Sequence, residues 1–325
     1  MKLRKRWSIV VALLLCLSVL LTACGEKDTG ESGTVDVKDA VKLGVGCVTN
    51  QSMDGVDKIT TRATVAAVLL DKDGVIRRCR LDEVEFTVSA AGSDDMDLKS
   101  KWERGTSYRP TEKETGGKSE LSSSWQEQVK AFCNFVEGKT PGEVKGIAAT
   151  DGKSEDIPGC ELIITDFIEA VGKAAGMATT QAQATAAHTM GLAVTGKSGG
   201  TATAPQVELE LAAVSRDTEG RITGCYTDGL QVKLQVVDNT FATIDNMPAT
   251  KREQGDAYNM KAASGIKKEW YEQAAAFDHF AVGKTPAELS GLKLNAEGKT
   301  DAIAGCTIAV DGMVKNAVKA AETEE

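Results

Sequence analysis

Apolar and polar side chains alternate along several short segments of the chain. In residues 206–214 the polar positions separate the apolar side chains of Val207, Leu209, Leu211 and Ala213. A period of two predicts a half-buried strand. Asp-Gly at 73–74 and Glu-Gly at 219–220 suit tight hairpin turns, and strand-like patterns follow them at 84–88 and 230–237. The pattern therefore predicts small antiparallel sheets in both halves of the chain.

After each predicted sheet the apolar period becomes that of a helix. Residues 125–136 place Trp125, Val129, Phe132 and Val136 on one face, and residues 270–281 repeat the pattern with Trp270, Ala274, Phe277 and Ala281. Thr-Pro pairs at 140–141 and 285–286 are each followed two positions later by Glu. A further helix is expected to start there, because Thr caps free N–H groups, Pro suits the first turn and Glu reaches back to the cap.

One unit is written twice along the chain, at an offset of 145–146 residues. The matching blocks are residues 71–79 with 217–225, 122–147 with 267–292, 155–164 with 301–310, and the closing helical segments 166–175 with 312–321. This spacing is the size of a domain. We therefore predict an α+β fold of two homologous domains, 43–176 and 188–325, joined by residues 177–187 as a flexible linker or weak helix. Each domain is expected to be a small antiparallel sheet packed with about three helices, and to include a short strand at its Gly-Cys pair.

The N-terminus carries four cations, an apolar run and then the tetrapeptide Leu21-Thr22-Ala23-Cys24. This arrangement predicts a signal peptide at residues 1–23. The tetrapeptide resembles the lipobox of bacterial lipoproteins, which implies cleavage before Cys24 and attachment of lipid to its thiol. Acyl chains would anchor the protein to the membrane, and residues 24–42, which are poor in apolar side chains, predict a disordered tether. The expected location is the extracytoplasmic face of the cell membrane.

The formal charge of −9 includes four cations of the signal peptide, so the mature part carries −13. An acidic surface argues against nucleic acid and anionic lipid as partners. Residues 191–198, GLAVTGKS, match the phosphate-loop pattern, but their flanks predict neither the preceding strand nor the following helix, so we interpret the match as chance. The two histidines, His188 and His279, lie in different copies and no C-x-x-C spacing occurs, so no metal site is predicted. No catalytic constellation stands out.

Six cysteines remain after the signal peptide and Cys24 are set aside: Cys47, Cys79, Cys133, Cys160, Cys225 and Cys306. An even number in an oxidising compartment favours disulfides, and fifteen full pairings are open. The repeat makes Cys79–Cys160 and Cys225–Cys306 the simplest pairs. Cys47 and Cys133 both lack a counterpart in the second copy and suggest a third pair. Free thiols in a strict anaerobe are the rival interpretation.

The Gly-Cys stretch of the second copy resembles a motif of the extracytoplasmic FMN-binding domain family, which serves bacterial flavin-linked electron transfer. In that family a hairpin with an Asp-Gly turn is followed by Asp, three residues, Gly-Ala-Thr and a closing helix. Here Asp301, Gly305 and Thr307 occupy those positions. The resemblance implies FMN joined through its phosphate to Thr307 by a separate flavin transferase. A glycine lets phosphate approach the backbone, and a helix start offers free N–H groups.

Both copies depart from the family pattern. Cys306 replaces its Ala, and in the first copy Glu155 and Glu161 replace its Asp and Thr, where a carboxylate would repel phosphate. Two hypotheses therefore stand open. One is a lipid-anchored carrier that passes electrons to a redox partner through a flavin on the second domain. The other is a flavin-free, disulfide-stapled binding or structural lipoprotein. Both describe a carrier or binding protein rather than a catalyst, and the first copy is expected to lack flavin.

Overall fold

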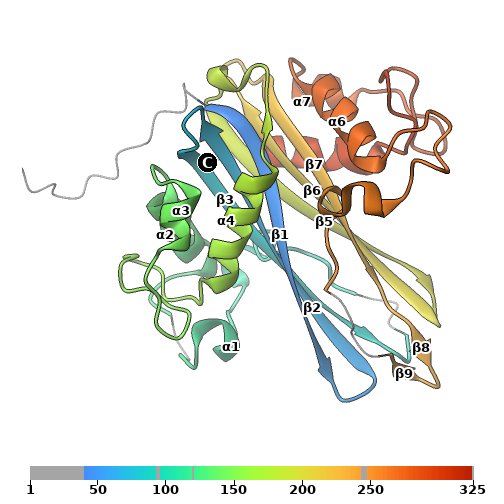
Figure 1. The fold of residues 1–325 in the computed structure, drawn as a ribbon. Coiled ribbons are helices and arrows are strands. Elements are labelled where there is room, and N and C mark those ends of the chain that lie inside the picture. Colours follow the sequence, from blue (N-terminus) through green and yellow to red (C-terminus); the bar gives the residue numbers. More distant parts are fainter. Residues whose placement is uncertain (1–39, 93–95, 119–120, 243–246, 324–325) are drawn as a thin grey trace, which may run out of the picture. The chain divides into compact units, whose positions relative to one another are not determined.

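A computed structural model describes residues 40–92, 96–118, 121–242 and 247–323 (Figure 1). The predicted signal peptide 1–23, the lipidation at Cys24 and the tether up to residue 39 lie outside these residues. The tether prediction of 24–42 ends too late, because residues 40–42 already belong to the first strand. Within the described part of the chain, no helix has the length and apolar character needed to cross a membrane.

Each repeat contains three long antiparallel strands, so the chain has the predicted α+β fold. The first sheet has the order β3-β2-β1-β4 and contains β1 (Ala40–Asp54), β2 (Lys58–Asp71), β3 (Ile76–Ser89) and the short β4 (Thr179–Thr180). The second has the order β5-β6-β7 and contains β5 (Thr189–Thr201), β6 (Ala204–Arg216) and β7 (Ile222–Lys233). A small ribbon follows, made of β8 (Val236–Val237) and β9 (Thr240–Phe241).

The predicted hairpin turns are confirmed at both positions. Gly74 and Gly220 have φ values of +80° and +79°, which only glycine adopts without strain. The Asp71 carboxylate accepts the N–H groups of Asp73 and Val75, which stabilises the first turn. Residues 177–187, predicted as a flexible linker or weak helix, contain instead a short strand, β4, which pairs with β1, and one 3-10 turn, Ala184–Ala186.

The helices follow their sequence signals closely. In the first repeat they are α1 (Glu112–Thr115), α2 (Trp125–Val136), α3 (Pro141–Lys145) and α4 (Thr165–Met177), with a 3-10 turn at Gly105–Ser107. In the second they are α5 (Lys251–Gln254), α6 (Trp270–Ala281), α7 (Pro286–Ser290) and α8 (Asp311–Glu322), with a 3-10 turn at Gly255–Tyr258. Thr140 and Thr285 cap α3 and α7 as predicted, and each accepts the N–H of the glutamate three residues later.

The strand predicted at each Gly-Cys pair is wrong. Residues 155–164 and 301–310 form irregular turns before the closing helices. Gly159 and Gly305 have φ values of +83° and +82°, which turn the chain away from an extended path. The backbone N–H groups that follow bond to a glutamine side chain of the preceding long helix instead of to a neighbouring strand.

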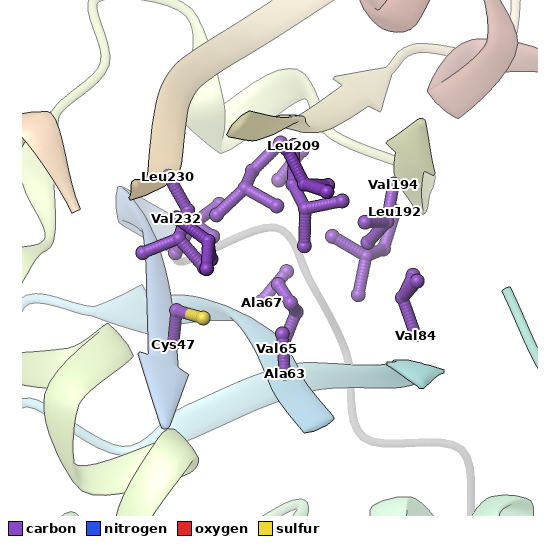
Figure 2. Close-up of a cluster of buried hydrophobic side chains, with 14 of the residues drawn as sticks. Cys47, Ala63, Val65, Ala67, Val84, Leu192, Val194, Leu209, Leu230 and Val232 are labelled. Atoms are coloured by element: carbon purple, nitrogen blue, oxygen red, sulfur yellow. The ribbon is translucent and has the colours of Figure 1, made fainter. Parts of the chain in front are cut away.

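Each sheet has one face covered by its own helices and one face packed on the other sheet. The first helix-side core joins β2 and β3 to α2 and α4, and the second joins β6 and β7 to α6 and α8. The remaining faces meet in a third core that draws on both repeats, where Val65 and Ala67 lie near Leu192 and Leu209 (Figure 2). The two repeats therefore share a core, and the described residues from 40 to 323 form one compact unit.

Contacts between the repeats are reciprocal. Lys173 of α4 forms an ion pair of 3.0 Å with Glu253 of α5, and Lys319 of α8 forms one of 2.6 Å with Glu103. The two lysines occupy the same place in their repeats, as do the two glutamates. The lysine of each repeat thus pairs with the glutamate of the other, which is the reciprocal pattern of a two-fold symmetric dimer interface.

Candidate functional site

A cavity of about 650 Å³ opens on the helix side of the second sheet. Its walls come from β6, β7, the segment around α5 and α6, and the beginning of α8. The side chains that matter for its chemistry are Lys251, Tyr258, Trp270, Gln273, Thr307 and Glu210. The volume is in the range of small-molecule and cofactor pockets.

Thr307 lines this cavity, and its hydroxyl is held by one buried side chain. Gln273 of α6 accepts the backbone N–H of Thr307 at 2.9 Å and its hydroxyl at 3.1 Å. The amide nitrogen of Gln273 donates to the Ser264 hydroxyl and to the Lys268 carbonyl, both at 3.2 Å. These bonds fix the amide orientation, so the Thr307 hydroxyl proton points to Gln273 and its lone pairs remain available.

Gln273 was missed in the sequence, although a signal was present. It is fully buried, and its equivalent in the first repeat, Gln128, is also fully buried. Both follow a tryptophan by three residues on the apolar face of their helices. A polar residue kept on a buried face in both copies indicates a specific hydrogen-bonding task.

Lys251 approaches the cavity across two aromatic rings. Its ammonium lies 5.1 Å from the ring centre of Trp270 and 5.8 Å from that of Tyr258. The two rings pack edge to face with their centres 6.5 Å apart. Lys251 is only 7% exposed, so its charge is largely removed from water. The cation–π attraction between its ammonium and the two rings is therefore stronger than it would be at the surface.

Three carboxylates complete the polar lining. Glu208 pairs with Lys197 at 2.8 Å and accepts from Gln231, and these bonds hold its pKa below the usual value although burial opposes them. Burial raises the pKa of Glu210. Asp311 belongs to the first turn of α8, whose leading N–H groups have no intrahelical acceptor. The cavity therefore offers hydrogen-bond donors, acceptors and charges of both signs.

The equivalent region of the first repeat is filled by ion pairs. The Lys101 ammonium bonds to Glu83 and Glu114 and lies over Tyr108 and Trp125. Beside them Arg62 pairs with Asp166 at 2.9 Å. Only about 160 Å³ remains there.

The three predicted flavin-site residues are not gathered at one point. Thr307 lines the cavity, whereas neither Asp301 nor Gly305 does. Asp301 is exposed in the turn before Thr307. Gly305 has the close approach expected of a glycine there, because a Cβ would lie 2.8 Å from the Lys268 ammonium. The structure thus brings an unpredicted cation, Lys268, to the backbone two residues before the predicted attachment residue.

All six described cysteines are buried free thiols, and none of the predicted disulfides is formed. Cys79, Cys133 and Cys160 share the first helix-side core, and Cys225 and Cys306 share the second. Cys47 lies in the core between the sheets, so the first sheet separates it from Cys133 and the Cys47–Cys133 prediction is not supported. Burial raises the pKa of the Cys160 thiol to about 11, which keeps it protonated at neutral pH.

Phosphate-loop and metal chemistry find no support in the described residues. Residues 191–198 lie inside β5, with no loop or helix after them, so the match to the phosphate-loop pattern is confirmed as chance. No cluster of three or more histidine, cysteine or carboxylate side chains suited to a metal ion occurs in the part of the chain that the structure describes.

Comparison with known proteins gives a short partial match. No family model matches the chain, and no solved structure matches it. A segment of 40 residues is 50% identical to part of a protein named chlorophenol reductase from Desulfitobacterium hafniense. The segment covers 12% of this chain and 12% of that protein, so the chain is similar to it over a small part of its length only.

Proposed function

We propose that the chain is a lipid-anchored extracytoplasmic carrier that binds FMN in the cavity of its second repeat, joined to Thr307, and passes electrons to a redox partner. The observation that carries the proposal is the place of Thr307. Thr307 lines a cavity of about 650 Å³ whose wall also includes two aromatic rings and a buried lysine. The membrane anchor rests on the lipobox resemblance at Cys24, and the flavin rests on the motif resemblance at 301–307 together with this cavity.

The residues present fit a flavin nucleotide in their chemistry. The Lys268 ammonium lies beside Gly305, two residues before Thr307, and is suited to a phosphate group. The free N–H groups at the start of α8 are also suited to one, with Asp311 in that turn opposing them. Trp270 and Tyr258 offer an apolar and aromatic wall for a flat ring system. Bound FMN would supply the electron transfer, and the protein would supply position and surroundings.

The role of the chain itself is to present and orient the acceptor hydroxyl. Gln273 holds the Thr307 hydroxyl proton, so the oxygen has a fixed direction in the cavity. When a phosphoester forms, the Thr307 oxygen would lose this proton and bond to the flavin phosphate of a dinucleotide donor brought by a flavin transferase. The P–O bond between that phosphate and the rest of the donor would break, and the remaining nucleotide would leave. The backbone N–H of Thr307 still donates to Gln273 afterwards, so the turn keeps its anchor.

The first repeat is proposed to be flavin-free. Glu161 takes the position of Thr307, and its carboxylate bonds to Lys118 and to the Ser122 backbone. These hydrogen bonds lower the pKa of Glu161 to about 2, so it is anionic at any ordinary pH and repels a phosphate. The 40-residue similarity to a protein named a reductase accords with a redox role.

Mass spectrometry and visible absorption of the mature protein, coexpressed with a flavin transferase, test this function. We expect a flavin spectrum and one FMN-sized adduct on the peptide that contains Thr307. Thr307→Ala should lose the adduct and Thr307→Ser should retain it, since only the hydroxyl is needed. A protein without a flavin spectrum, or an adduct that persists in Thr307→Ala, would contradict the proposal.

The first repeat offers a matched control. Glu161→Thr restores the hydroxyl residue to the position equivalent to Thr307 but leaves the Lys101, Glu83 and Glu114 cluster in place. If an open cavity is required, this variant gains no second adduct. Two adducts would show that the hydroxyl residue alone suffices.

A further inference from the structure

Lys251 has a counterpart in the first repeat whose surroundings differ in one respect. Lys101 and Lys251 are both buried and both lie over a tyrosine and a tryptophan, at 5.2 and 5.5 Å for Lys101 and 5.8 and 5.1 Å for Lys251. The residue after each lysine donates its backbone N–H to a buried aspartate, Asp82 at 3.1 Å or Asp228 at 3.0 Å. These shared contacts identify the two lysines as equivalent.

The carboxylates that neutralise Lys101 are missing around Lys251. Glu83 directly follows Asp82 on β3, whereas Gly229 directly follows Asp228 on β7. Glu114 stands thirteen residues after Lys101, and Ser264 stands at the same distance from Lys251. Both acidic side chains are thus replaced by residues without charge, while the cation is retained.

No carboxylate in the described residues bonds to Lys251 in their place. No ion pair joins Lys251 to a carboxylate among residues 40–92, 96–118, 121–242 and 247–323, and the Lys251 side chain packs closely against the backbone of Gly229. The charge of Lys251 lowers the pKa values of Glu208 and Glu210, but neither carboxylate bonds to it: Glu208 is engaged by Lys197 and Gln231, and burial raises the pKa of Glu210. A buried cation whose partners have been removed is costly unless a ligand compensates it.

We propose that Lys251 receives a delocalised negative charge of a flat ligand beside Trp270 and Tyr258, in the place that the Glu83 and Glu114 carboxylates take against Lys101. The cavity would therefore prefer flat anionic molecules over neutral ones of the same shape. If the ligand is flavin, the charge is the one that the ring carries when reduced, and in that form the inference rests on the proposed function. Lys251 is then a specificity-determining residue, distinct from the Thr307 attachment point.

The first test uses the mature protein without flavin, and thermal unfolding with benzoate and with benzamide as probes. We expect benzoate to raise the melting temperature more than benzamide, and we expect this difference to disappear in Lys251→Met. Lys233→Met is the control, because Lys233 is exposed at the end of β7 and does not line the cavity. Equal shifts, no shift with benzoate, or a preference that survives in Lys251→Met would overturn the proposal.

A second variant tests the same charge by restoring it within the chain. The Cβ of a residue at 229 would lie 3.2–3.3 Å from the end of the Lys251 side chain, so Gly229→Glu brings a carboxylate within its reach. The benzoate preference should vanish there and persist in Gly199→Glu, where a Cβ meets nothing within 4 Å. Persistence of the preference in Gly229→Glu would count against the proposal.

The flavin-loaded protein gives a readout other than activity. In Lys251→Met we expect the affinity for reduced relative to oxidised flavin to fall about tenfold, which lowers a two-electron midpoint potential by about 30 mV. Spectroelectrochemistry measures this change, and an unchanged potential would contradict the flavin form of the inference. Absence of the Thr307 adduct would instead defeat the proposed function, and the benzoate experiment would still decide the role of Lys251.

Discussion

The two repeats place a lysine on the same pair of aromatic rings but surround it differently. Lys101 is closed in by Glu83 and Glu114, whereas Lys251 faces a cavity about four times larger than the space left beside Glu83 and Glu114. Each arrangement is built on the sheet and helices of its own repeat, and these elements are equivalent in the two repeats. The first repeat has Glu83 and Glu114 where the second has Gly229 and Ser264. The comparison teaches that exchanges at these two positions distinguish a buried ion-pair cluster from an open cavity.

A second exchange acts at the other end of the cavity. Gln128 and Gln273 accept the backbone N–H groups of Glu161 and Thr307, at 2.7 and 2.9 Å. The backbone is therefore anchored in the same way in both repeats. The anchored residue differs in its side chain. In the first repeat it is Glu161, whose carboxylate bonds to Lys118, and in the second it is Thr307, which lines the cavity. The bond from the backbone N–H to the buried glutamine is thus a structural feature of both repeats, and the chemistry of each site depends on the side chain at position 161 or 307.

Removal of each lysine should break the comparison most strongly. Lys101→Met leaves Glu83 and Glu114 buried without a cation, and we expect a loss of about 3–5 kcal/mol in the free energy of unfolding. Lys251→Met leaves no bonded carboxylate behind, so its loss should stay within about 1 kcal/mol. Urea unfolding measures both. Equal losses would mean that the two lysines have the same electrostatic partners after all.

The close approach of the closing helices should be equally sensitive in both repeats. A Cβ at Gly44 would lie 2.1 Å from the Ala174 carbonyl oxygen, and one at Gly191 would lie 1.8 Å from that of Ala320. Such overlap pushes α4 or α8 away from its sheet, and we expect Gly44→Ala and Gly191→Ala each to cost about 1–3 kcal/mol or more. Gly199→Ala, on an open part of β5, should change stability by much less.

Local signals made much of this fold predictable. Alternation along 206–214, the turn glycines and the Thr-Pro helix starts each depend on residues close in sequence, and the structure has the expected element at each. The Gly-Cys strand failed because short apolar runs do not distinguish a strand from a buried turn. Its positive-φ glycine and the glutamine that accepts its N–H belong to different parts of the chain.

The site was only partly predictable. Thr307 was found through its motif, but Lys251 was hidden because the repeat offset grows from 146 residues in the strands to 150 between Lys101 and Lys251. An alignment at constant offset therefore does not pair the two lysines. The cavity is lined by Gly312, which has no side chain to fill it, and a missing side chain gives no signal in the sequence until the neighbouring elements are in place.

The buried aspartates Asp82 on β3 and Asp228 on β7 should make the stability of the protein depend on pH. Burial raises the pKa of Asp82 to about 7 and that of Asp228 to about 6, with Arg252 and Asp278 beside the latter. Between about pH 4 and these values the folded state holds a proton that the unfolded state has lost, so stability falls as pH rises. Asp82→Asn and Asp228→Asn should each flatten this fall.

The two flattening effects should differ in the pH range over which they act. Burial raises the pKa of Asp82 to about 7 and that of Asp228 to about 6, so the decline that Asp82→Asn removes should extend to higher pH than the decline that Asp228→Asn removes. Urea unfolding at several pH values gives both curves. A decline that is unchanged in both variants would show that other groups control the pH dependence.

The smallest effect is expected where the first repeat replaces the hydroxyl. Glu161→Thr removes the ion pair with Lys118, whose side chain is about half exposed, and such pairs contribute about 0–1 kcal/mol. The Gln128 anchor to the backbone N–H of residue 161 remains, so the turn should keep its shape. Gln128→Leu removes that anchor, leaves a buried N–H without a partner and should cost about 1–3 kcal/mol. If Glu161→Thr cost as much as Gln128→Leu, the carboxylate would be part of the architecture, and the exchange between Glu161 and Thr307 would not separate structure from chemistry as proposed.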